Sequence, residues 1–244
     1  SETHEIDCLS ADIARLQAEG TDAALRESIE LLQALLPLIS QAEQDGLSEV
    51  DILYFIGITY SKIEEQEEAL NYYQQALLQH QADGDRSQEA NVLNKMGNAH
   101  TALGAIETAR DRYQQAKAIY RELNDLEGTA TVLTNLASIY SDLGNRDLAL
   151  ENYNQALEIA IQQEDALGEA TIRNNIGLVH TQWDAPTLAI EQHTEALQLY
   201  RALTDNDGEA NALNNLGVAH NALGEKETAL DYYQQASALY SQLG

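Results

Sequence analysis

The sequence has 244 residues and carries 40 acidic against 13 basic side chains, a formal net charge of −27. Nucleic acids and anionic membrane surfaces attract proteins through clustered lysine and arginine, so this charge argues against both as partners. The chain is 44% hydrophobic but has no apolar run of about 18 residues, as a transmembrane helix needs. The start, SETHEIDCLS, lacks the basic region and apolar core of a signal peptide, so we expect a cytoplasmic location.

The first 50 residues contain two apolar stripes with helical spacing. They consist of Ile6, Leu9, Ile13 and Leu16, and of Leu25, Ile29, Leu32, Leu36 and Ile39. Such spacing places the side chains of each stripe on one face of a helix. We therefore predict a helical hairpin over residues 1–50 that caps the repeats after it, with a kink or an early helix end at Pro37.

From residue 51 onward the sequence repeats itself with a period of 40, in the copies 51–90, 91–130, 131–170, 171–210 and 211–244. Each copy has an apolar residue followed by a small one: Ile56-Gly57, Met96-Gly97, Leu136-Ala137, Ile176-Gly177 and Leu216-Gly217. Each also has a ring in its second half: Tyr73, Tyr113, Tyr153, His193 and Tyr233. A fixed period in this range indicates a solenoid of stacked supersecondary units.

This pattern resembles the tetratricopeptide repeat, whose usual period is 34. The longer copies are similar to those of kinesin light chain and of LGN/Pins-type adaptors. The resemblance implies an all-α fold, a right-handed α-solenoid of about six helix-turn-helix repeats. It also implies that the first helix of each repeat lines a concave groove for a protein or peptide partner.

Turn and cap residues recur within the copies. Asp125, Asp165 and Asp205 stand where a carboxylate can accept the unpaired N–H groups of a helix start. Gly104, Gly144 and Gly224 follow the first helices, where a left-handed residue reverses the chain. In the fourth copy Asp184 replaces this glycine. Pro186 should begin the next helix, because proline is tolerated in a first turn. Trp183 is expected to pack between helices.

A polar strip remains on the first helices once the packing positions are removed. The candidate peptide-binding residues on it are Asn94, Lys95, Asn98, Asn135, Ser138, Arg173, Asn174, Asn175, Asn214 and Asn215. An asparagine amide can pair with both N–H and C=O of an extended peptide. The column Asn135, Asn175 and Asn215 resembles the asparagine ladder of the O-GlcNAc transferase repeats, which holds extended polypeptide. The alternative is that these asparagines are only common filler of the repeat.

Catalytic and metal-binding motifs are not found in the sequence. His100, His180 and His220 occupy equivalent places in different repeats, and one ring per repeat cannot easily converge on a metal. We interpret them as core rings and expect no metal, no cofactor and no enzymatic activity. A carboxylate clamp of the cochaperone type would need several basic groove residues, and Lys95 and Arg173 do not have its spacing.

The sequence therefore predicts a protein-interaction scaffold with an Asn-lined concave groove, expected to be a fragment of a larger protein. The first alternative is a sensor or regulatory arm of a multidomain enzyme or transcription regulator. The second is a self-assembly module, a homo-oligomer formed through the C-terminal repeat. Leu230, Tyr233, Leu239 and Tyr240 would there present an apolar face with no following helix to cover it.

Overall fold

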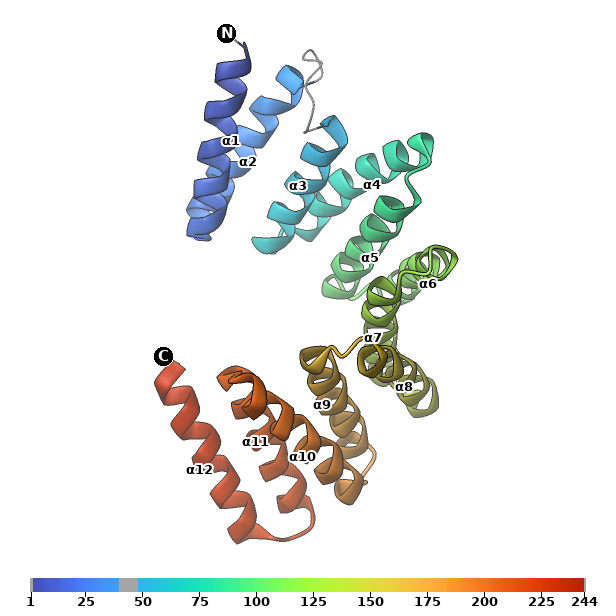
Figure 1. Ribbon diagram of the computed structural model, residues 1–244, viewed down its shortest axis with the longest axis vertical. Coiled ribbons are helices and arrows are strands. Elements are labelled where there is room, and N and C mark those ends of the chain that lie inside the picture. The colour runs from blue at the N-terminus through green and yellow to red at the C-terminus, as the bar shows by residue number, and fades with distance from the viewer. Residues whose placement is uncertain (1, 40–47, 244) are drawn as a thin grey trace. The chain divides into compact units, whose positions relative to one another are not determined.

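The computed structural model describes residues 2–39 and 48–243, and its regular structure there is entirely α-helical (Figure 1). The helices are α1 (Glu2–Glu19), α2 (Asp22–Ile39), α3 (Glu49–Lys62), α4 (Gln66–Asp83), α5 (Arg86–Ala102), α6 (Ile106–Glu122), α7 (Leu126–Asp142), α8 (Arg146–Gln162), α9 (Ala166–Gln182), α10 (Pro186–Leu203), α11 (Asn206–Ala222) and α12 (Lys226–Leu243). None of these helices is both long enough and apolar enough to cross a membrane.

The chain divides into two compact units, Ser1–Asn124 and Asp125–Gly244. In the N-terminal unit α1 packs on α2, α3 on α4 and α5 on α6; in the C-terminal unit α7 packs on α8, α9 on α10 and α11 on α12. Each unit is thus built from three helical pairs, which confirms the predicted all-α architecture of helix-turn-helix repeats. The predicted division at residue 50 and the predicted repeat boundaries stay predictions, and the pairs of the C-terminal unit begin at Leu126, Ala166 and Asn206.

Aspartate caps and left-handed turn residues set the helix limits, as the sequence predicts. The Asp165 carboxylate accepts a hydrogen bond from the Gly168 N–H at 2.9 Å, and Asp125 and Asp205 cap α7 and α11 in the same way. The turn between α9 and α10 is made by Asp184 at φ 53°, and Pro186 occupies the first turn of α10. Each pair can therefore reverse direction within a few residues.

We expect the substitution Asp205→Ala to lower the free energy of unfolding by about 1 kcal/mol, because the first-turn N–H of Gly208 loses its acceptor. Urea denaturation measures the loss. Asp207→Ala is the matched control, since Asp207 is an exposed acid in the same first turn that makes no cap. Equal losses in the two variants would mean that negative charge near the helix start, rather than the cap, is what stabilises α11.

The N-terminal hairpin buries the predicted stripes against the first repeat. Ile6, Leu25, Ile29, Leu32 and Ile39 form one apolar cluster. The same cluster includes Leu35 of α2 and Ile52, Ile56 and Ile63 after it in the chain. The helix α2 continues through Pro37 to Ile39, and the next residues lie outside the described part of the chain.

Close approach of the two helices in a pair requires a small residue opposite the ring. A Cβ atom at Gly177 would lie 2.5 Å from Cε1 of the His193 ring, and one at Gly217 would lie 2.6 Å from Cε1 of the Tyr233 ring. Such distances are well inside van der Waals contact, so a side chain there would push the helices apart. The ring and the small residue therefore act as one packing unit in these repeats.

Candidate functional site

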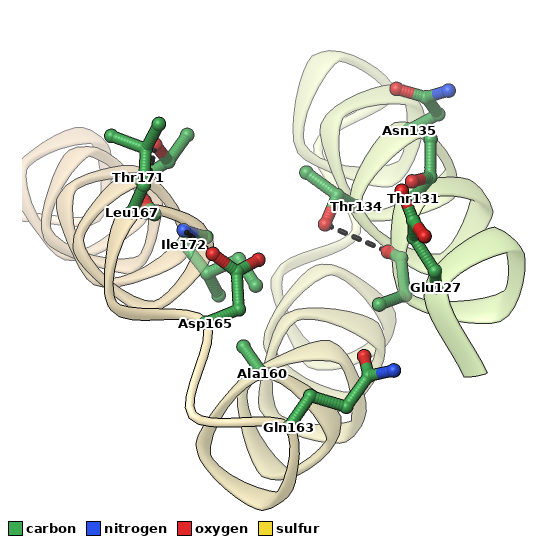
Figure 2. A pocket seen from close by; sticks show the side chains of 12 residues that line it. Glu127, Thr131, Thr134, Asn135, Ala160, Gln163, Asp165, Leu167, Thr171 and Ile172 are labelled. Carbon is green, nitrogen blue, oxygen red and sulfur yellow. Dashed lines mark hydrogen bonds between the residues drawn. The ribbon is translucent and has the colours of Figure 1, made fainter.

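Two neighbouring cavities lie along α7 and α9 in the C-terminal unit. The first has a volume of about 350 Å³ and lies between α7, the end of α8 and the start of α9 (Figure 2). The second has about 380 Å³ and is lined by the C-terminal halves of α7 and α9 together with Tyr153 of α8. Because Thr134 and Asn135 line both cavities, we treat them as one depression, the α7–α9 trough.

Several of the predicted groove residues line this trough. Asn135 borders both cavities, and Ser138 and Asn175 border the second. Figure 2 shows Asn135 and Thr131 on α7, across the first cavity from Thr171 on α9. The structure thus brings two rungs of the predicted asparagine column to one depression, one from each of two successive first helices.

Tyr153 of α8 also lines the second cavity. Burial raises the pKa of Tyr153 to about 12, while its hydrogen bond to Ser138 acts in the opposite direction. The phenol is therefore neutral at physiological pH. Nearby, Ser141 donates a hydrogen bond to Oε1 of Gln182 at 2.9 Å, which joins α7 to α9 at the end of the trough.

Asn174 and Asn215 hydrogen-bond inside the fold. The Asn215 amide donates to Oδ1 of Asn174 at 3.1 Å, and the same oxygen lies 2.8 Å from Nδ1 of His193. Because Oδ1 accepts, the His193 proton resides on Nδ1. His193 is fully buried, and burial lowers its pKa to about 4, with His180 contributing. The ring is therefore neutral, and its buried Nε2 has no hydrogen-bond partner in the described residues.

The other predicted residues lie apart from the trough. Arg173 is ion-paired with Glu169 and Glu195, so its charge is already compensated within the repeat. Asn214 is exposed and lines neither cavity.

Three predicted residues belong to the N-terminal unit, on α5. Asn94 is only 8% exposed and Lys95 is half-buried. Asn98 accepts a hydrogen bond from the Tyr113 hydroxyl at 2.7 Å. None of these three residues lines either cavity of the trough.

Gln163, Asp165 and Leu167 line the first cavity but were not among the predicted site residues. They occupy the junction between α8 and α9, where the sequence indicates only a helix start. Leu167 is 51% exposed beside this cavity, an exposure that only the structure shows.

The trough is lined by acids and by neutral groups. Glu127 and Asp165 border the first cavity and Asp142 the second, and no lysine or arginine lines either. Among the described residues, no group of three or more histidine, cysteine, aspartate or glutamate side chains is arranged to hold a metal. The arrangement suits contact with a neutral or cationic chain through hydrogen bonds and apolar surface.

The fold, a tandem array of helical pairs with small residues facing rings, defines a repeat protein. Models of the tetratricopeptide repeat match residues 52–87 and, in overlapping windows, 88–162, 128–202 and 168–242. The chain belongs to the tetratricopeptide repeat family. A comparison with curated proteins finds no match.

Several solved structures have the same fold. The BtubC protein of P. vanneervenii is 19% identical, with 100% of this chain and 92% of that chain covered and a TM-score of 0.72. The RapI protein in its apo form is 16% identical over 99% of this chain and 77% of that chain, with a TM-score of 0.75. A signal-transduction ATPase from Pyrococcus horikoshii with a tetratricopeptide repeat sensor is 18% identical, at 98% and 39% coverage and a TM-score of 0.77. At these identities the likeness concerns the fold.

Proposed function

We propose that this protein is an interaction scaffold that holds an extended segment of a partner polypeptide in the α7–α9 trough. The observation that carries the proposal is that Asn135 and Asn175, on successive first helices, both line the second cavity of the trough, and that Asn135 also lines the first. Concave sites with a few converging polar groups are the usual place for ligands. An amide from each of two helices can pair with the main chain of an extended peptide.

The trough offers complementary contacts for side chains as well. Leu178, 44% exposed, borders the same cavity as Asn175 and provides an apolar surface. Asn175 makes no hydrogen bond to any other described residue, so its amide is available to a ligand. Glu127, Asp142 and Asp165 favour a neutral or basic segment over an acidic one. The role is binding rather than catalysis.

Proteins of the same fold support this reading. The Rap conjugation gene regulator of plasmid pLS20 was solved in complex with the Phr* peptide, and another Rap protein with the competence and sporulation factor. These are 16% and 20% identical to this chain, with TM-scores of 0.67 and 0.66. They show that this fold can take such ligands.

We expect peptides selected from a random twelve-residue library on the intact chain to bind about fivefold more weakly to the Asn175→Ala variant. The reason is that one main-chain hydrogen-bond pair is lost, at about 1 kcal/mol. Dissociation constants from fluorescence anisotropy measure the change. Because Asn175 is not bonded to the described residues, its loss should leave thermal stability nearly unchanged.

Asn214→Ala is the matched control, since Asn214 is an exposed asparagine on the next first helix and lines neither cavity. Its binding should equal that of the parent chain. Leu178→Arg, which places a bulky cation in the trough, should abolish binding. Selected peptides that bind all three variants equally would locate the binding site elsewhere and overturn the proposal.

The archaeal ATPase favours a second candidate, a sensor arm that reports ligand binding to an attached domain. In that protein the repeats are described as a sensor, and this chain spans 39% of its length. The two candidates share the trough and differ in what the bound segment changes. Peptide-induced protection of backbone amides far from α7 and α9 in hydrogen exchange would favour the sensor, whereas protection confined to these helices would favour the plain scaffold.

A further inference from the structure

The N-terminal unit contains a mostly apolar cavity where α1, α2 and α3 meet, unlike the polar α7–α9 trough. It has a volume of about 390 Å³. Its walls are mostly apolar, with Ile13 from α1, Leu32 and Leu35 from α2, and Phe55 and Ile58 from α3. Phe55 is 47% exposed, so the cavity opens to solvent along one side. We call it the α1–α3 pocket.

Polar side chains gather at one end of the α1–α3 pocket. The Gln17 amide donates to the hydroxyls of Ser28 at 2.7 Å and Thr59 at 2.8 Å. Its oxygen accepts a hydrogen bond from the Lys62 ammonium at 3.1 Å. Since both donors of this amide are engaged, Gln17 is fixed, and it holds Lys62 at the pocket rim.

Lys62 places a positive charge at this rim. It forms no ion pair with the described residues, although the chain has 40 acidic side chains. No aspartate or glutamate lines the α1–α3 pocket. The pocket therefore combines an apolar cavity with one positioned positive charge, in contrast to the acidic and polar α7–α9 trough.

We propose that the α1–α3 pocket is a second binding site, which takes the carboxyl-terminal residue of a partner polypeptide when that residue has a large apolar side chain. The side chain fills the cavity against Leu35, Ile58 and Phe55, and the terminal carboxylate lies on the Lys62 ammonium. The cavity size suits one large side chain, and the open side at Phe55 leaves room for the rest of the partner. This site is independent of the trough, because it lies in the other unit.

The test uses the intact chain, methyl-labelled for NMR, and the probe N-acetyl-L-phenylalanine, which presents a ring and a terminal carboxylate. We expect it to shift the methyl signals of Ile13 and Ile58 and to leave those of Leu178 in the trough unchanged. Its neutral analogue N-acetyl-L-phenylalaninamide should bind about fivefold more weakly, because it lacks the charge that meets Lys62.

Two variants separate the charge from the cavity. Lys62→Ala should weaken binding of the acid to the level of the amide and leave the amide unaffected, whereas Lys95→Ala, a lysine outside the pocket, should change neither. Ala14→Trp fills the cavity from the exposed face of α1 and should abolish binding of both probes.

Three results would overturn the proposal. The first is that N-acetyl-L-phenylalanine and its amide bind equally tightly, or that Lys62→Ala does not change the affinity for the acid. The second is shifts at Leu178 as large as those at Ile58, which would mean unspecific association. The third is sodium octanoate binding ten times more tightly than N-acetyl-L-phenylalanine, which would make the ligand a free aliphatic acid. Loss of peptide binding in the trough through Asn175→Ala would leave all of these readouts unchanged. The two proposed binding sites can therefore be tested independently.

Discussion

Between pH 6.5 and pH 4 we expect the C-terminal unit to lose about 3 kcal/mol of stability through His193 alone. Burial lowers the folded-state pKa of His193 to about 4, against about 6.5 in the unfolded chain. In this range the unfolded state therefore binds a proton that the folded state does not, and the free energy of unfolding falls as the pH falls. The contribution is fully present above pH 6.5 and is lost below pH 4.

The structural cause is a site that cannot accept a second proton. Protonation would add an N–H at the buried Nε2, which has no acceptor among the described residues, and would place the charge near His180. The other ring nitrogen, Nδ1, already donates its hydrogen bond to Oδ1 of Asn174. The ring would have to break its packing against Gly177 to reach water.

The comparison of the parent chain with His193→Tyr isolates this contribution, because four of the five copies carry tyrosine at the equivalent position. Urea denaturation at pH 7 and pH 4.5 should show a difference between the two proteins that grows as the pH falls. The reciprocal variant Tyr153→His should gain the same pH dependence. A difference that does not change with pH would show that His193 titrates as if it were exposed.

Replacing Leu216 by alanine is expected to cost about 3 kcal/mol at neutral pH. Leu216 is fully buried on α11, in an apolar cluster with Leu197, Tyr200 and Leu213. Removing its branched end leaves a cavity that α10 and α11 cannot close without shifting inward from their packed positions. The free energy of unfolding from urea denaturation measures the loss.

The same substitution at Leu230 provides the control. Leu230 lies in the same helical pair, on α12, and is 57% exposed, so Leu230→Ala should change stability by less than about 0.5 kcal/mol. A large loss at Leu230 would show that its side chain is covered in solution. In that case the predicted self-assembly through the C-terminal repeat would be the first explanation to test, by sedimentation of the parent chain over a range of concentrations.

The candidate site could be predicted only in part from the sequence. The period of 40 placed Asn135 and Asn175 on first helices at equivalent positions, and both line the trough. The same reasoning could not separate Asn175 from its neighbour Asn174, which turns to His193. Adjacent residues on a helix point about 100° apart, and which direction meets another helix depends on the packing of the pair.

The α1–α3 pocket is a site that the sequence pattern does not predict at all. In the first copy Phe55 stands at the position that Asn135, Asn175 and Asn215 occupy in later copies, so the pattern gives it no role. In the structure it lines the mostly apolar α1–α3 pocket. Its partners Ile13 and Leu35 come from α1 and α2, helices that only the tertiary packing brings together with α3. A cavity arises where packing is incomplete, and no periodicity in a sequence encodes that volume.

The amino-acid pattern alone predicts the repeat, its helical content, its caps at Asp125, Asp165 and Asp205, and the small residue opposite each ring. These depend on contacts that recur every 40 residues between neighbours in the chain, so a local pattern carries them. Which polar side chains reach solvent and which are buried follows from the packing of the helices. That choice depends on atoms contributed by successive repeats, whose distances follow from how closely the helices pack.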